Sequence, residues 1–150
     1  MGEVHGITVI DDYAHHPTAI RKTLSGYREF YPGRRIVLDF MSHTYSRTKA
    51  LLPEFARALS AADVLILHEI YASAREENPG DVSGEILANA VRQTSSHPET
   101  VHYVPAVLDA LPIVRDLVGE GDLFVTMGAG NNWELGPLLV RELLLTGAGA

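Results

Sequence analysis

The 150-residue sequence contains no cysteine, few basic residues and no long apolar run. The absence of cysteine excludes a disulfide framework and thiolate chemistry. With 12 Lys and Arg against 19 Asp and Glu, the net charge is -7, which argues against a nucleic-acid binder because such proteins cluster basic side chains along phosphates. No signal peptide opens the chain, and no segment approaches the roughly 20 apolar residues of a membrane span. We therefore expect a cytoplasmic protein that binds neither nucleic acid nor membrane.

Several catalytic motifs are also missing. The sequence has no Gly-x-x-x-x-Gly-Lys-Ser/Thr loop, no nucleophile elbow and no His-Glu-x-x-His motif. These motifs supply a phosphate site, an activated serine and a zinc-bound water, respectively. We therefore predict that this chain contains no catalytic residue of its own.

Short apolar runs alternate with longer segments of helical period, a pattern typical of α/β proteins. Strands are predicted at 7–10, 35–40, 63–70, 100–104 and 123–127, and helices at 17–31, 48–60, 83–93, 106–118 and about 133–145. Runs such as 64–67 are apolar on both faces, as in a parallel sheet covered by helices on both sides. The length is that of one domain. We predict a single Rossmann-like α/β domain, three-layered and doubly wound, with a mostly parallel sheet of about five or six strands.

Ligands of open α/β sheets bind beyond the carboxyl ends of the strands. Four segments that follow predicted strands are unusual: 11–17, 42–48, 69–80 and 128–132. The last, Gly-Ala-Gly-Asn-Asn, resembles a phosphate-binding turn only weakly. The third is long enough to be functional, although its mixed charges, Arg75 beside Glu76 and Glu77, also suit a solvated connector.

The first segment is a dense polar cluster that contains Asp11, Asp12, Tyr13, His15 and His16. Carboxylates can accept hydrogen bonds from ribose hydroxyls, and imidazoles can stack on a base or bind a carboxylate. A helix cap with solvated histidines is the alternative. A metal site is disfavoured because adjacent side chains diverge and three or four ligands must converge.

The second segment contains His43 and Arg47 just before a predicted helix. A guanidinium can bind a carboxylate with two parallel hydrogen bonds, and the positive end of a helix dipole assists it. Arg47 is therefore the best candidate for a carboxylate clamp. The alternative is a surface arginine whose stem covers apolar area.

These segments resemble, in order, signatures of the C-terminal (third) domain of the Mur ligase family, in its L-alanine-adding branch. The similar blocks are Asp11-Asp12-Tyr13-Ala14-His15-His16-Pro17-Thr18, His43-Thr44-Tyr45-Ser46-Arg47-Thr48, Ile70-Tyr71-Ala72 with Asn78-Pro79-Gly80, and Thr126-Met127-Gly128-Ala129-Gly130. The sequence departs from the family pattern at Met41-Ser42, at 72–75, which is one residue out of step, and at Asn131-Asn132. The murein tripeptide ligase shares the first block but lacks the second, and a free-standing nucleotide-binding module would not need the second.

The resemblance implies a part of an ATP-dependent acid–amino-acid ligase for peptidoglycan synthesis, and thus for cell shape and division. In that family one domain binds UDP-N-acetylmuramate, a central domain holds ATP and Mg2+, and the third brings L-alanine and closes over the nucleotide. Residues 1–150 correspond to the third domain, without the N-terminal UDP-binding and central ATP-binding domains, and are expected to be inactive alone.

The resemblance also implies roles for individual residues. Arg47 would bind the L-alanine carboxylate, with Tyr13, His15 and His43 completing the pocket. Asp12 would hold the ATP ribose, and His15 or His16 would lie against the nucleoside. No metal ligand is expected in this chain, because Mg2+ would be held mainly by the central domain.

Overall fold

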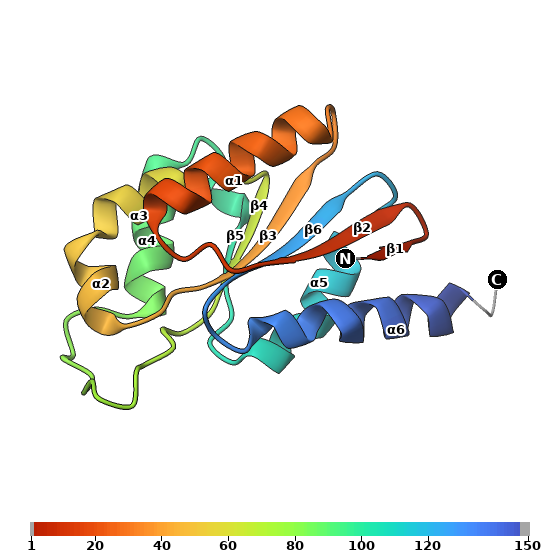
Figure 1. Ribbon diagram of the computed structural model, residues 1–150. Helices are drawn as coiled ribbons and strands as arrows, with labels where there is room; N and C mark the ends of the chain where they lie inside the picture. The colour runs from red at the N-terminus through yellow and green to blue at the C-terminus, as the bar shows by residue number, and fades with distance from the viewer. Residues whose placement is uncertain (1, 148–150) are drawn as a thin grey trace.

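The computed structural model describes residues 2–147, which form a six-stranded sheet between two layers of helices (Figure 1). The strand order is β1-β2-β6-β3-β4-β5; β2 to β6 are parallel and β1 pairs with β2 in the antiparallel sense. The bounds are β1 Gly2–Val4, β2 Ile7–Asp12, β3 Ile36–Met41, β4 Val64–Leu67, β5 Val101–Tyr103 and β6 Leu123–Gly128. The predicted doubly wound α/β fold is confirmed.

The sheet separates two apolar layers. Helices α1 (Pro17–Phe30), α3 (Leu52–Leu59) and α4 (Gly84–Thr94) cover one face, and α5 (Leu111–Leu117) and α6 (Leu135–Gly147) cover the other. The strands β2, β3, β4 and β6 contribute residues to both layers, so Leu38 packs on the first and Val37 on the second. No helix in residues 2–147 is both long and apolar enough to cross a bilayer.

Several elements differ from the sequence-based prediction. The strand predicted at 63–70 is only Val64–Leu67, and the helix predicted at 106–118 begins as the 3-10 helix Val107–Ala110 before α5. Strand β1 was not predicted. The helix predicted at 48–60 is two helices, α2 (Tyr45–Ala50) and α3, separated at Leu51. Pro53 explains the break, because its ring would clash with the carbonyl of residue 49 in one continuous helix. The break makes α2 a short, separate element at the end of β3.

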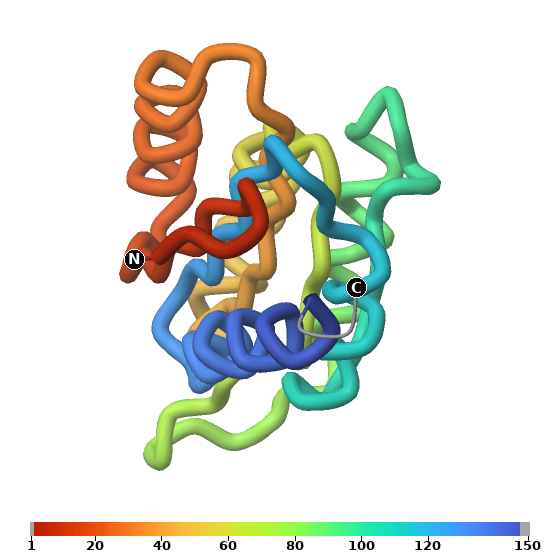
Figure 2. Tube along the Cα trace, turned by 90° about the vertical axis from the view of Figure 1, so that its right-hand side faces the viewer, coloured from red at the N-terminus to blue at the C-terminus, as the bar shows by residue number. Residues whose placement is uncertain are grey.

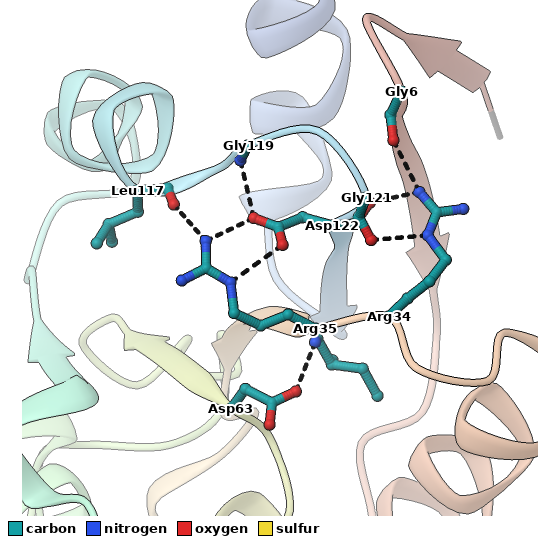
Figure 3. A network of polar contacts seen from close by, with 9 residues as sticks. Gly6, Arg34, Arg35, Asp63, Leu117, Gly119, Gly121 and Asp122 are labelled. Atoms are coloured by element: carbon teal, nitrogen blue, oxygen red, sulfur yellow. Dashed lines mark hydrogen bonds and ion pairs between the residues drawn. The ribbon is translucent and has the colours of Figure 1, made fainter.

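Two arginines tie the amino ends of the strands together (Figure 3). Arg35 donates to both carboxylate oxygens of Asp122, from Nε at 3.0 Å and from Nη2 at 2.6 Å. The Asp122 side chain is only 7% exposed. Arg34 donates from Nη2 to the backbone oxygens of Gly6 (2.9 Å) and Asp122 (2.7 Å) and from Nη1 to Thr8 Oγ1 (2.7 Å). This end of the sheet is filled by internal contacts.

Replacing Asp122 with Ala tests this network. Because the substitution leaves the Arg35 guanidinium without its bidentate partner, we expect the free energy of unfolding to fall by about 2 kcal/mol, measured by urea denaturation. The matched control is Asp116→Ala, because Asp116 is 73% exposed where it pairs with Arg115. Equal effects of the two substitutions would show that the network does not stabilise the sheet.

Candidate functional site

The carboxyl ends of β2, β6 and β3 lie side by side at the edge that faces α2 (Figure 1). Asp12 and Phe40 both pair with Met127, from opposite sides of β6. Since neighbouring strands are about 4.8 Å apart, the loops that follow β2 and β3 begin roughly 10 Å from each other. These two loops lead to helices on one face and the loop after β6 leads to the other. Such a divergence is where open α/β sheets form a ligand crevice.

Asp12 is fixed at this edge by two internal hydrogen bonds. Its Oδ1 accepts from the Ala14 N–H at 2.8 Å and its Oδ2 from the Tyr27 hydroxyl at 2.7 Å. Burial and the Asp12 carboxylate raise the pKa of Tyr27 far above its ordinary value, so the phenol remains a donor. Each Asp12 oxygen has accepting capacity left for a further donor such as a hydroxyl.

The two adjacent histidines enter different surroundings. The His15 Nδ1 lies 2.9 Å from the Tyr13 carbonyl oxygen, which can only accept, so Nδ1 carries a proton. The His15 ring also meets the Tyr13 ring edge-on at 5.2 Å. The His16 Nδ1 instead accepts from the Thr18 N–H at 3.2 Å, so its imidazole proton is on Nε2. His16 lines a cavity of about 300 Å³ between α1 and α3, together with Arg21 and Arg57.

The second cluster is built on the turn between β3 and α2. Thr44 has a φ of 66°, a conformation that costs a β-branched residue about 1–3 kcal/mol. Its N–H donates to the Tyr71 carbonyl at 3.0 Å, and its carbonyl accepts from Thr48 Oγ1 at 2.8 Å. His43 lies beside Tyr71, with ring centroids 6.0 Å apart. Arg47 is partly buried, and its Nη1 is fully buried without a hydrogen-bond partner within residues 2–147.

A residue that sequence reasoning missed, Glu76, lies against α2. It belongs to the loop of residues 69–83, which we call the strap and which projects from the body of the molecule in both views (Figures 1 and 2). Glu76 accepts hydrogen bonds from the backbone N–H groups of Tyr45 and Ser46, both at 2.7 Å. Hydrogen bonding from Ser46 and Tyr45 and the nearby His43 outweigh desolvation and hold the pKa of Glu76 below its ordinary value. The sequence offers no signal that separates Glu76 from Glu77.

A buried polar network lies beneath this edge of the sheet, and it was not predicted from the sequence. Asp39, in the middle of β3, is 0% exposed and accepts from Asn132 Nδ2 at 2.8 Å, while its other oxygen lies 2.8 Å from His68 Nε2. The His68 Nδ1 donates to the Val104 carbonyl at 2.7 Å. Burial disfavours the charged imidazole, but the bonds to Asp39 and Val104 outweigh it and raise the pKa of His68. Asn132 is thus a core residue.

The turn after β6 is closely packed. A Cβ atom at Gly128, whose φ is 124°, would lie 2.2 Å from the Met41 carbonyl oxygen, and one at Gly130 would lie 2.3 Å from the Met41 sulfur. The glycines therefore serve close packing against β3. Across residues 2–147 no three His, Cys, Asp or Glu side chains are grouped so that they could share a metal ion.

The structure thus forms two clusters on either side of the end of β6. Tyr13, His15 and Asp12 lie at the end of β2, and His43 and Arg47 lie at the end of β3. Within the described range, no hydrogen bond joins the two clusters. His16 faces the separate α1–α3 cavity. A ligand that contacted both clusters would have to span the end of β6.

Comparisons with known proteins agree with this architecture. The family model for the Mur ligase, glutamate ligase domain, matches residues 1–130. UDP-N-acetylmuramate--L-alanine ligase of Treponema pallidum is 57% identical over 139 residues, which are 93% of this chain and 28% of that protein. The chain therefore spans about 28% of the length of such relatives.

Two solved structures share the fold. UDP-N-acetylmuramate-alanine ligase of Thermotoga maritima has a TM-score of 0.70 at 24% identity, covering 95% of this chain and 28% of that one. A murein peptide ligase of Psychrobacter arcticus has a TM-score of 0.68 at 26% identity, and the match again covers 95% of this chain and 28% of that one.

The buried pair of Asp39 and His68 predicts a pH dependence of stability. A histidine whose pKa is raised by folding stabilises the protein fully below its unfolded pKa, about 6.5, and the contribution is lost as the pH rises through the folded pKa. The double variant Asp39→Asn, His68→Asn has no titratable group in the network. We expect the stability of the unmodified chain relative to this variant to decline over the pH range above about 6.5, the ordinary pKa of histidine.

The measurement is urea denaturation of both proteins across that range. NMR titration of the His68 imidazole tests the same point without a substitution, in case the double variant does not fold. A midpoint below that of an ordinary histidine would contradict the raised pKa.

Proposed function

This chain belongs to the Mur ligase family, and we propose that it is the amino-acid-binding, nucleotide-closing domain of an ATP-dependent ligase that joins L-alanine to UDP-N-acetylmuramate in peptidoglycan synthesis. The 57% identity to an L-alanine ligase across 93% of the chain carries this proposal. The UDP-sugar site and most of the ATP and Mg2+ site would belong to the parts of the protein that lie outside these residues.

We propose that Arg47 binds the L-alanine carboxylate. Its buried Nη1 has no partner among the described residues, and a planar guanidinium matches a carboxylate with two parallel hydrogen bonds. His43 lies on the same side of the crevice, and Tyr13 with His15 lies on the other. A small amino acid held between the two sides would be oriented at both ends, whereas a larger amino substrate would have to project out of the crevice.

For the nucleotide, we propose that Asp12 accepts from the ribose hydroxyls. Its carboxylate is fixed by Ala14 and Tyr27 and has accepting capacity left. The contacts of His15 with Tyr13 favour a place in the amino-acid pocket, although its Nε2 is also free to reach the nucleoside. His16 faces a cavity with two arginines, which favours a place near the nucleotide.

In the proposed reaction the carboxylate of UDP-N-acetylmuramate attacks the γ-phosphorus of ATP and releases ADP. The amino group of L-alanine then attacks the acyl carbon, phosphate leaves, and the amine loses a proton as the amide forms. This domain would supply no catalytic group. Its contribution would be to hold the amine near the acyl carbon, and such positioning contributes roughly 7–11 kcal/mol in well-oriented reactions.

A chimera tests the function. If this chain replaces the matching 28% of the Treponema pallidum ligase, we expect ADP release that depends on L-alanine and UDP-N-acetylmuramate together. The 150-residue chain alone should release none, since the ATP site is incomplete. Release with the tripeptide of the murein tripeptide ligase but not with L-alanine would overturn the proposed substrate. Submicromolar ATP binding by the isolated chain would favour a free-standing nucleotide-binding module.

The substitution Arg47→Lys tests the carboxylate clamp in the same chimera. Lysine keeps the charge but cannot form the bidentate pair. Because one charge-assisted hydrogen bond is lost, we expect the KM for L-alanine to rise about tenfold, while the KM for ATP is unchanged. Arg141→Lys, an exposed arginine on α6, is the matched control. An unchanged KM for L-alanine would remove Arg47 from the pocket.

A further inference from the structure

The strap is anchored at its base beside the proposed amino-acid pocket. Glu69 Oε1 accepts from the N–H groups of Ile70 and Gly84, both at 2.8 Å, so that the two ends of the strap meet. Tyr71 then pairs in parallel with the segment that continues β3, because its N–H donates to the Ser42 carbonyl at 2.8 Å and its carbonyl accepts from the Thr44 N–H. The residues that follow Tyr71 start from a fixed point.

The far part of the strap returns to α2 through two carboxylates. Glu76 binds the N–H groups of Tyr45 and Ser46, and Asp81 pairs with Lys49 on the next turn. Arg47 lies between these two anchor points. Its own N–H donates to Thr44 Oγ1 at 3.4 Å. The first-turn N–H groups of α2 are thus all bound by the protein itself.

This arrangement has two consequences for a carboxylate ligand. The helix N–H groups are not open to it, so the guanidinium of Arg47 has to bind it. A helix of six residues is also far too short to hold its own geometry in water, and the preceding Thr44 has a strained backbone. Contacts from outside α2 therefore have to determine where Arg47 points, and the two Glu76 hydrogen bonds act on the two residues directly before it.

We propose that Glu76 is a positioning residue for the Arg47 clamp: by binding the first turn of α2, its carboxylate orients the Arg47 guanidinium toward the ligand carboxylate and closes the helix N–H groups to that ligand. The strap becomes, by this inference, a wall of the amino-acid pocket. The inference rests on the proposed role of Arg47 in L-alanine binding.

The test in the chimera is Glu76→Gln, which removes the charge and leaves only one accepting oxygen for two N–H groups. We expect the KM for L-alanine to rise about tenfold, as for the loss of one hydrogen bond to a charged group, while kcat at saturating L-alanine and the KM for ATP stay within about twofold. Glu76→Asp, which keeps the carboxylate, should recover part of the loss. The matched control is Glu77→Gln, because Glu77 is exposed and makes no hydrogen bond or ion pair within residues 2–147.

A double substitution tests whether Glu76 acts through Arg47. In an Arg47→Ala background, Glu76→Gln should cause less than about a twofold further change, because effects of coupled residues do not add. An unchanged KM for L-alanine in the single variant would overturn the inference. So would an equal rise in KM in the Arg47→Ala background, which would show that Glu76 acts independently.

NMR of the 150-residue chain separates failure of this inference from failure of the proposed function. The amide resonances of Tyr45 and Ser46 should titrate together, with a midpoint below that of an ordinary glutamate, and Glu76→Gln should shift the Arg47 Nε–Hε resonance while Glu77→Gln leaves it unchanged. These results would support the contact even if the chimera shows no activity with L-alanine. Amides that do not titrate, or an Arg47 resonance unaffected by Glu76→Gln, would overturn the inference even if the chimera is active.

Discussion

The Asp39 carboxylate has no access to water, and both of its oxygens are bound by side chains from other segments of the chain. A buried charge is tolerated only when its partners are in place, so His68 must directly follow β4 and Asn132 must follow β6 at fixed positions. His68 leads directly to Glu69, which joins the two ends of the strap. The strap in turn determines the position of α2. The geometry around Arg47 therefore depends on a hydrogen-bond network in the middle of the sheet.

Much of the fold could be predicted from the sequence, because its central strands are continuous apolar runs that only a sheet covered on both faces accommodates. The runs at 36–38, 64–67 and 123–125 are of this kind. Strand β1 could not be predicted, since Gly2-Glu3-Val4 is too short to show a period and is defined by pairing with β2. Pro53 is a local signal that α2 and α3 are separate helices. The helical periodicity of residues 48–60 concealed it.

That the candidate segments lie at the carboxyl ends of the strands could also be predicted, whereas the contacts among them could not. The rule that ligands bind at the carboxyl ends of strands identified all four segments that meet at this edge. The partner of the α2 N–H groups comes from 30 and 31 residues further along the chain, and no local pattern distinguishes it from its neighbour. The contrast between His15 and His16 likewise arises from hydrogen bonds that the residue types alone do not specify.

Surface loops normally tolerate insertions and deletions, because their ends are held and their middles are free. The strap differs, since Tyr71 is bound to the turn before α2 and Glu76 is bound to the first turn of α2. The four residues between them have to span a set distance. A change of length at 72–75 would therefore alter the distance between these two fixed points. We expect such changes to arise during evolution together with compensating substitutions in α2 or in the turn before it, so that the two segments vary as a unit.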